Sequence, residues 1–255
     1  MQEQLKMMVC WIHENGLADT IYLVLQFSAL TLCLIMAARL GTKFGFGFMQ
    51  AFVAVTIEVG MVYGEMAVLC EILDSLVPAH IPIMNSYYNN VGRTFILVPL
   101  SGLLVSWVMK ADMKKIMAIY SFAQPIIWGL ASLPCLLAGC CRGYPWKWGV
   151  YNYEEQTFLF PTQLVNAVLL SMLAGFTVYR AKKMKYQPDG YEYPLALIVI
   201  GLIRFSTEFI MDSPKIVWGW SSLSFDSLVM VATGCILCAA ISIYKRSRRN
   251  LRVPI

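Results

Sequence analysis

The chain has 255 residues, of which 58% are hydrophobic and only 14% are charged, and its mean hydropathy is +0.62. A soluble domain carries about 25% charged residues, and here the deficit extends along the whole chain, which excludes a soluble domain with a single anchor. The net charge of +5 calls for no nucleic-acid partner, because basic loops that face anionic lipid account for it.

Apolar runs of about 18 to 25 residues alternate with short charged segments, and a run of that length spans a bilayer as a helix. We therefore predict an all-α, polytopic integral membrane protein that forms a single transmembrane domain over residues 1–255. The third predicted span is the shortest and contains Pro99 and Gly102, so we expect it to be tilted or broken. The seven predicted spans are about 20–38, 48–70, 94–109, 115–139, 161–179, 193–211 and 223–244.

The distribution of basic residues predicts the orientation of these spans, because Lys and Arg concentrate in cytoplasmic loops. With the C-terminus inside, the inner loops and the tail carry 14 Lys and Arg residues and the outer segments carry five. The N-terminus is therefore predicted to be outside. The inner set is Arg39, Lys43, Lys110, Lys114, Lys115, Arg180, Lys182, Lys183, Lys185, Lys245, Arg246, Arg248, Arg249 and Arg252.

The eight cysteines do not have the spacing of a metal site, and we expect neither a metal nor a cofactor. Cys135, Cys140 and Cys141 lie together at the outer end of the fourth span, and a disulfide among them is left open. The first 19 residues are too polar for a signal peptide.

A buried arginine is the strongest functional signal. Arg204 lies near the middle of the sixth span, and Glu208 follows one helical turn later. A guanidinium in hydrocarbon costs at least a few kcal/mol, so it must face a partner, a wet cavity or a substrate. One interpretation is that Glu208 neutralises Arg204 on the same helix. Glu58 and Glu65 share a face of the second span; we favour a partnership with the arginine over a proton relay or inert protonated groups.

Three segments are expected to meet on the outer side: the end of the fourth span, the start of the fifth and the outer half of the sixth. Gly139 and Gly143 allow close backbone approach, Arg142 lies at headgroup depth, and Gln163 places an amide just below the interface. A planar guanidinium binds phosphate bidentately. The segments therefore predict a pocket, open to lipid, for an anionic phospholipid headgroup. Asp226 is interpreted as a helix-start residue.

The motifs in these segments resemble those of the prolipoprotein diacylglyceryl transferase family, most clearly between Leu130 and Gly234. They are Cys-Leu-Leu-Ala-Gly-Cys-Cys-Arg-Gly at 135–143, Phe-Pro-Thr-Gln-Leu at 160–164 and Gly-Leu-Ile-Arg-Phe-Ser-Thr-Glu-Phe at 201–209. The resemblance implies a multi-pass enzyme of the bacterial cytoplasmic (inner, plasma) membrane, in lipoprotein biosynthesis. Such an enzyme moves diacylglycerol from phosphatidylglycerol onto the lipobox cysteine of a preprotein. It implies catalytic roles for Arg204 and Glu208, and substrate-binding roles for Arg142, Gln163, Gly139, Gly143 and Tyr22.

Several positions depart from the family pattern. Ser132 stands where the family has an arginine, Phe160 replaces a histidine, and Val165-Asn166 replace Tyr-Glu. Without that histidine, deprotonation of the acceptor thiol falls to Tyr22, Glu58, Glu65 or water. Two functions therefore stay open: a diacylglyceryl transferase, and a catalytically altered descendant that binds lipid or a partner protein without transfer. A transporter or channel ranks last, because the inner halves of the spans are mostly apolar.

Overall fold

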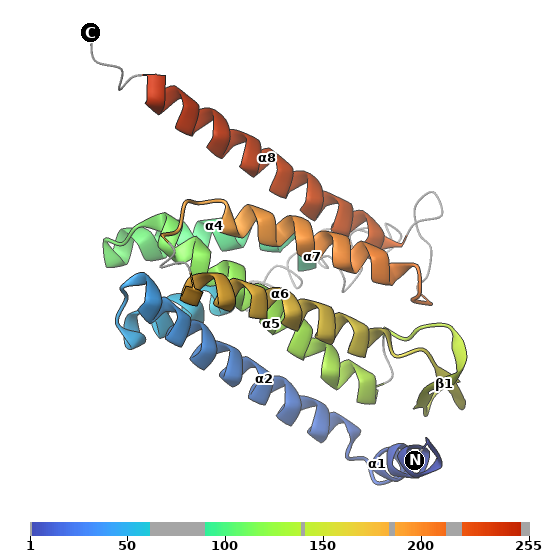
Figure 1. The fold of residues 1–255 in the computed structure, drawn as a ribbon. Coiled ribbons are helices and arrows are strands. Elements are labelled where there is room, and N and C mark those ends of the chain that lie inside the picture. Colours follow the sequence, from blue (N-terminus) through green and yellow to red (C-terminus); the bar gives the residue numbers. More distant parts are fainter. Residues whose placement is uncertain (1, 62–89, 139–140, 184–186, 213–220, 251–255) are drawn as a thin grey trace, which may run out of the picture.

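The computed structural model describes residues 2–61, 90–138, 141–183, 187–212 and 221–250. Within these ranges the chain is mostly helical, as predicted (Figure 1). The predictions about Glu65, Gly139 and Cys140 lie outside the described residues. The helices are α1 Gln2–Glu14, α2 Ala18–Gly41, the short η1 Thr42–Phe44, an apolar helix Phe48–Met61, α4 Asn90–Met109, α5 Met113–Ala138, α6 Thr162–Lys183, α7 Glu192–Glu208 and α8 Ser222–Asn250.

Helix α5 forms the centre of the bundle. It packs against α2, α4, α6 and α7, while α8 lies mainly on α7. In the 18-residue apolar window of Met113–Leu136, 72% of the residues are buried, against 17% in the corresponding windows of α2 and α8. The outer helices therefore present one side to the bundle, α2 to α5 and α8 mainly to α7, and leave their remaining apolar surface exposed, as expected for helices that face lipid.

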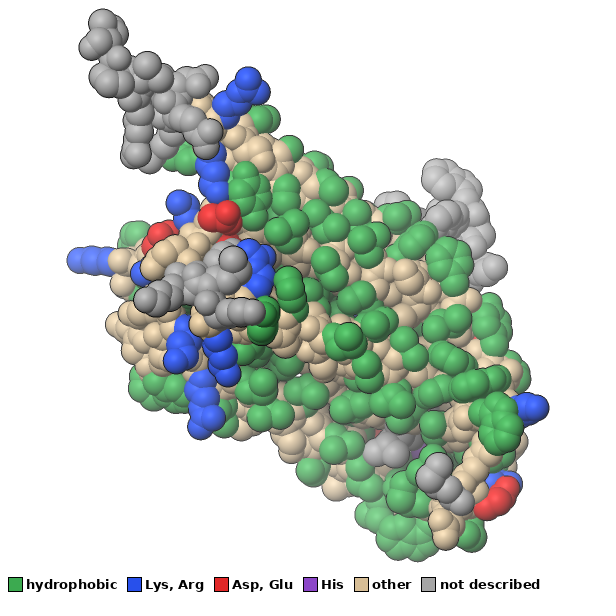
Figure 2. All heavy atoms as spheres, viewed as in Figure 1, with side chains coloured by type: hydrophobic (Ala, Val, Ile, Leu, Met, Phe, Trp, Pro, Cys, Tyr) green, Lys and Arg blue, Asp and Glu red, His purple; other side chains and the backbone are tan. Residues whose placement is uncertain are grey.

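Among the residues that the structure describes, four helices are long and apolar enough to cross a membrane: those over Ala18–Phe44, Met113–Leu136, Thr162–Lys182 and Asp226–Ser247. Hydrophobic side chains cover the middle of the molecule, and Lys and Arg side chains gather at one end (Figure 2). This basic end comprises the C-terminal ends of α2, α6 and α8 and the turn between α4 and α5. Four of the seven predicted spans thus meet the requirements of length and hydropathy.

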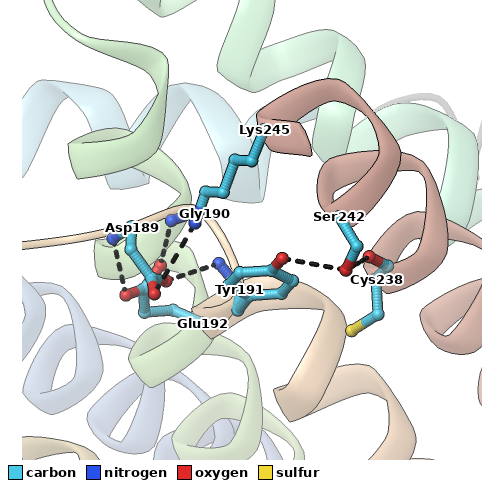
Figure 3. Close-up of polar contacts among 7 residues, drawn as sticks. All are labelled: Asp189, Gly190, Tyr191, Glu192, Cys238, Ser242 and Lys245. Atoms are coloured by element: carbon cyan, nitrogen blue, oxygen red, sulfur yellow. Dashed lines mark hydrogen bonds and ion pairs between the residues drawn. The ribbon is translucent and has the colours of Figure 1, made fainter. Parts of the chain in front are cut away.

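At the basic end, α7 and α8 are joined by polar side chains (Figure 3). The Lys245 ammonium lies 3.7 Å from the Asp189 carboxylate and 4.1 Å from the centre of the Tyr191 ring. The Tyr191 hydroxyl lies 2.9 Å from Ser242 Oγ. Glu192 accepts hydrogen bonds from the N–H groups of Asp189 and Gly190, which closes the first turn of α7.

The opposite end carries a β-hairpin, in the segment between the fourth and fifth predicted spans, where we predicted no regular element. Strands β1 Pro145–Asn152 and β2 Thr157–Leu159 pair antiparallel, with Tyr151 opposite Phe158. Aromatic and β-branched residues in β1 favour a strand over a loop. Helix α1, also not predicted, packs on the hairpin: Gln2 Nε2 donates to the Lys147 carbonyl at 2.8 Å. We call this the hairpin end.

Helix α4 is continuous through Pro99, although we expected the third span to be tilted or broken. Its contact with α5 depends on a small residue. A Cβ added at Gly102 would lie 2.8 Å from the sulfur of Met117 and 3.1 Å from Cε of Met113. The two helices therefore approach closely at this point.

Candidate functional site

Arg204 is enclosed between helices near the hairpin end of α7. Its guanidinium carbon lies 4.1 Å from the centre of the Trp128 ring on α5, a distance that permits a cation–π interaction. Its Nε atom is buried and has no hydrogen-bond partner among the described residues. The Trp128 ring thus covers one side of the guanidinium, and the Nε–H group of Arg204 stays available to donate a hydrogen bond.

Two buried carboxylates accompany this arginine. Glu208 on α7 and Asp226 near the start of α8 are 9% and 7% exposed, and together with Cys141 they act electrostatically on Arg204. Neither carboxylate forms a direct ion pair with the guanidinium within the described part of the chain. The interpretation in which Glu208 simply neutralises Arg204 as a neighbour on the same helix therefore lacks the expected contact.

Three buried polar atoms at this position have no described hydrogen-bond partner: Arg204 Nε, Glu208 Oε2 and Asp226 Oδ2. Buried polar groups in native proteins are almost always paired with protein, water or a ligand. A cationic donor and two acceptors that interact electrostatically and have open atoms are suited to a polar ligand. Asp226 is the residue that sequence analysis missed, because its position near a helix start had a simpler explanation.

The segment after α5 is fixed against two other segments by backbone hydrogen bonds. The Gly143 N–H donates to the Phe160 carbonyl at 3.2 Å, and the Asp212 N–H donates to the Arg142 carbonyl at 2.9 Å. A Cβ on Gly143 would lie 2.7 Å from the Phe160 oxygen and 2.8 Å from the oxygen of Ile210. Gly143 therefore allows its segment to lie close to the backbone of these two residues, as the sequence predicted.

Arg142 is engaged away from Arg204. Its guanidinium forms an ion pair with Glu155 at 2.5 Å and a second with Glu154 at 3.4 Å, both in the turn between β1 and β2. Arg142 and Gln163 line one small hollow beside the hairpin, and Arg204 and Glu208 are not among its lining residues. We expected Arg142 and Gln163 to line one cavity together with Arg204 and Glu208. In the structure the first two line the hollow beside the hairpin, and the other two do not.

Glu58 does not accompany Arg204, so the preferred partnership between them was wrong. Glu58 is 2% exposed, and it interacts with the Gln124 side chain of α5 and acts electrostatically on Tyr193. Tyr193 opens α7, whereas Arg204 comes 11 residues later, about 16 Å along a helix axis. The glutamate therefore lies nearer the basic end. Tyr22 lies in α2 and is half-buried.

The residues at the altered motif positions take part in structural contacts. Ser132 Oγ donates to the Trp128 carbonyl at 2.8 Å, within α5. The Phe160 ring lies 4.9 Å from the Trp146 ring of the hairpin. Asn166 Oδ1 accepts a hydrogen bond from Thr207 Oγ1 at 3.0 Å, which joins α6 to α7 one turn from Arg204.

Part of the chain is similar to a known enzyme. The phosphatidylglycerol–prolipoprotein diacylglyceryl transferase of Clostridium tetani is 26% identical to it over 111 residues. The match covers 41% of this chain and 44% of that protein, less than half of each. No protein-family model matches the chain. The similarity supports a distant relation to the transferase, and the membrane-spanning character of the helices agrees with it.

Proposed function

We propose that this chain is a divergent diacylglyceryl transferase of a bacterial plasma membrane. In this proposal seven spans cross the membrane, the N-terminus is outside, and the hairpin end faces the outer leaflet. The enzyme transfers diacylglycerol from an anionic, phosphatidylglycerol-like lipid to the cysteine of a lipoprotein precursor. The observation that carries the proposal is the enclosed Arg204, with an open donor, in a segment that resembles the family's motif.

The reaction follows from the chemistry of that site. The acceptor thiolate forms a carbon–sulfur bond to the glyceryl carbon, the bond from that carbon to the phosphate oxygen breaks, and glycerol phosphate leaves with the electron pair. Arg204 holds the phosphate and offsets the charge that develops on the leaving group. Trp128 fixes the plane of the guanidinium, so that its N–H groups meet the phosphate oxygens as a fork.

The two buried carboxylates supply the proton acceptor in this proposal. Glu208 and Asp226 each have a buried oxygen without a described hydrogen-bond partner, and one of these carboxylates accepts the proton of the acceptor thiol. It replaces the base that Phe160 is unable to supply.

The remaining predicted site residues complete the substrate-binding surface in this proposal. Arg142 and Gln163, beside the hairpin, contact the part of the substrate that extends beyond the phosphate. Gly139, Gly143 and Tyr22 are assigned to the same surface in this proposal, and Gly143 lets its segment approach the backbone of Phe160 and Ile210.

The second candidate is a descendant that binds lipid or a partner protein without transfer. It is favoured by Ser132 and Phe160, which stand at family arginine and histidine positions and are engaged in packing and helix contacts. The deciding experiment measures transfer of labelled diacylglycerol to a lipobox peptide by purified protein. Transfer by the wild type that is lost in Arg204→Ala supports the transferase. Phospholipid binding without transfer in either protein supports the second candidate.

A further inference from the structure

A second hollow, unrelated to the Arg204 site, lies at the basic end. It is situated between the turn that follows α2 and the turn that joins α4 to α5, and its volume is about 280 Å³. Its lining includes Phe44, Phe46, Gln50, Lys110, Asp112 and Lys115. A cavity of this size accommodates a small phosphorylated group such as a glycerol phosphate.

Three hydrogen-bond donors of this hollow have no partner among the described residues. They are the ammonium groups of Lys110 and Lys115 and the amide Nε2 of Gln50. The other side of the Gln50 amide is fixed, because its Oε1 accepts the Gly47 N–H at 2.9 Å. The Lys115 ammonium would be 3.8 Å from a Cβ at Gly45, so it lies beside the backbone of that turn.

The one carboxylate in the hollow already has a structural role. Asp112 Oδ1 accepts the N–H of Lys114 at 3.0 Å at the start of α5. The described lining carries two positive charges, on Lys110 and Lys115, and one negative charge, on Asp112. A phosphate is thus favoured over a cation or a neutral group.

Both helices that contribute to the hollow carry exposed apolar side chains within one turn of a lining residue. Met49 is 66% exposed and Trp107 is 79% exposed, and these residues precede Gln50 and Lys110 in the sequence by one and three positions. A basic pocket next to lipid-facing helices is the arrangement that binds anionic headgroups in membrane proteins.

We propose that this hollow is a binding site for a phosphate group, supplied by an anionic phospholipid of the leaflet at the basic end or by a soluble phosphate ester. Lys110 and Lys115 provide the charge and Gln50 provides a neutral donor. The site is independent of the proposed transfer reaction, because it lies at the opposite end of the helices from Arg204.

The test compares two double variants with equal loss of charge. Lys110→Gln/Lys115→Gln alters the hollow, whereas Lys43→Gln/Lys114→Gln removes two exposed lysines from the same turns. Each protein is placed in phosphatidylcholine nanodiscs that contain a small fraction of phosphatidylglycerol, and retained lipid is counted by native mass spectrometry. We expect the first variant to lose phosphatidylglycerol about tenfold or more, and the control to retain it. Lys110→Arg/Lys115→Arg should also retain it.

Calorimetric titration with sn-glycerol 1-phosphate and inorganic phosphate separates the two sources of phosphate. Binding of these compounds that is lost in Lys110→Gln/Lys115→Gln indicates that the site accepts soluble phosphate. Retained phosphatidylglycerol without such binding assigns the site to membrane lipid. Equal loss of phosphatidylglycerol in both Gln double variants, or equal retention of phosphatidylcholine and phosphatidylglycerol, overturns the proposal.

Discussion

Arg204 shows how a single charged side chain is accommodated inside a bundle of apolar helices. The ring of Trp128 covers it, and Glu208 and Asp226 offset its charge without a direct ion pair. This arrangement compensates for the burial of the guanidinium and still leaves its Nε open. The site is thus organised around the arginine before any ligand is present.

In the proposed transferase, Arg204→Ala should lower the rate of diacylglycerol transfer by about 10²–10³, the usual loss when one electrostatic donor to a transition state is removed. Arg204→Lys should also be poor, because lysine retains the charge but not the planar fork. Single-turnover transfer to a lipobox peptide measures both. The exposed Arg39 at the basic end gives a matched control, Arg39→Ala. Equal rates for Arg204→Ala and the wild type would remove Arg204 from the mechanism.

Asp226→Asn should destabilise the protein by about 1–3 kcal/mol, because the shape of the side chain is retained while Arg204 loses a compensating charge. Thermal unfolding in detergent measures the change. Asp212→Asn is the control, since Asp212 is exposed. If both variants unfold at the same temperature, Asp226 does not stabilise the arginine.

At the scale of elements, close backbone contacts at the hairpin end position the site. The 141–143 segment is hydrogen-bonded to residues before α6 and after α7, and these contacts join the ends of three helices. Glycine also allows close contact between helices. A Cβ at Gly201 on α7 would lie 2.8 Å from the Ser227 carbonyl oxygen on α8. Small residues at such contacts are typical of membrane bundles.

Gly143→Ala should therefore destabilise the hairpin end by about 1–3 kcal/mol, because the new methyl group meets two backbone oxygens that are unable to move separately. Gly175→Ala on α6 is the matched control, since a Cβ there meets no atom within 4 Å. The control should be neutral or stabilising by up to about 1 kcal/mol. Thermal unfolding of the two variants gives the comparison, and similar destabilisation in both would contradict it.

At the scale of the whole molecule, the asymmetry of charge between the two ends governs orientation. Lys and Arg side chains gather at one end of the molecule, as Figure 2 shows. Anionic lipid and the insertion machinery both favour such an end on the cytoplasmic side. The hairpin, α1 and the Arg204 site would then lie on the outer side.

A reporter that is active only in the cytoplasm should therefore be active when fused after α8. A reporter that is active only outside should be inactive at the same position. The reverse pattern would invert the proposed topology and would move the Arg204 site to the cytoplasmic leaflet. Fusions before α1 provide the complementary measurement.

Sequence alone determined the mostly helical, apolar character of the chain and the approximate limits of most described helices, and it singled out Arg204 as a charge within an apolar helix. These follow from hydropathy, chain length and the cost of a buried charge, which are local properties. The hairpin and α1 were missed because the segments are short and their stability comes from mutual contact, such as the bond from Gln2 to the Lys147 carbonyl.

Only the tertiary structure decided which charged residues meet. Asp226 joins Arg204 because α7 and α8 pack side by side, whereas Glu58 is close to Gln124 at another depth of the bundle. Arg142 turns to the acidic hairpin turn because Glu154 and Glu155 are brought next to it by strand pairing. Such contacts depend on how each helix is rotated about its axis and shifted along it relative to its neighbours. Packing between distant segments sets this rotation and shift. The hydrophobic periodicity of one segment does not specify them.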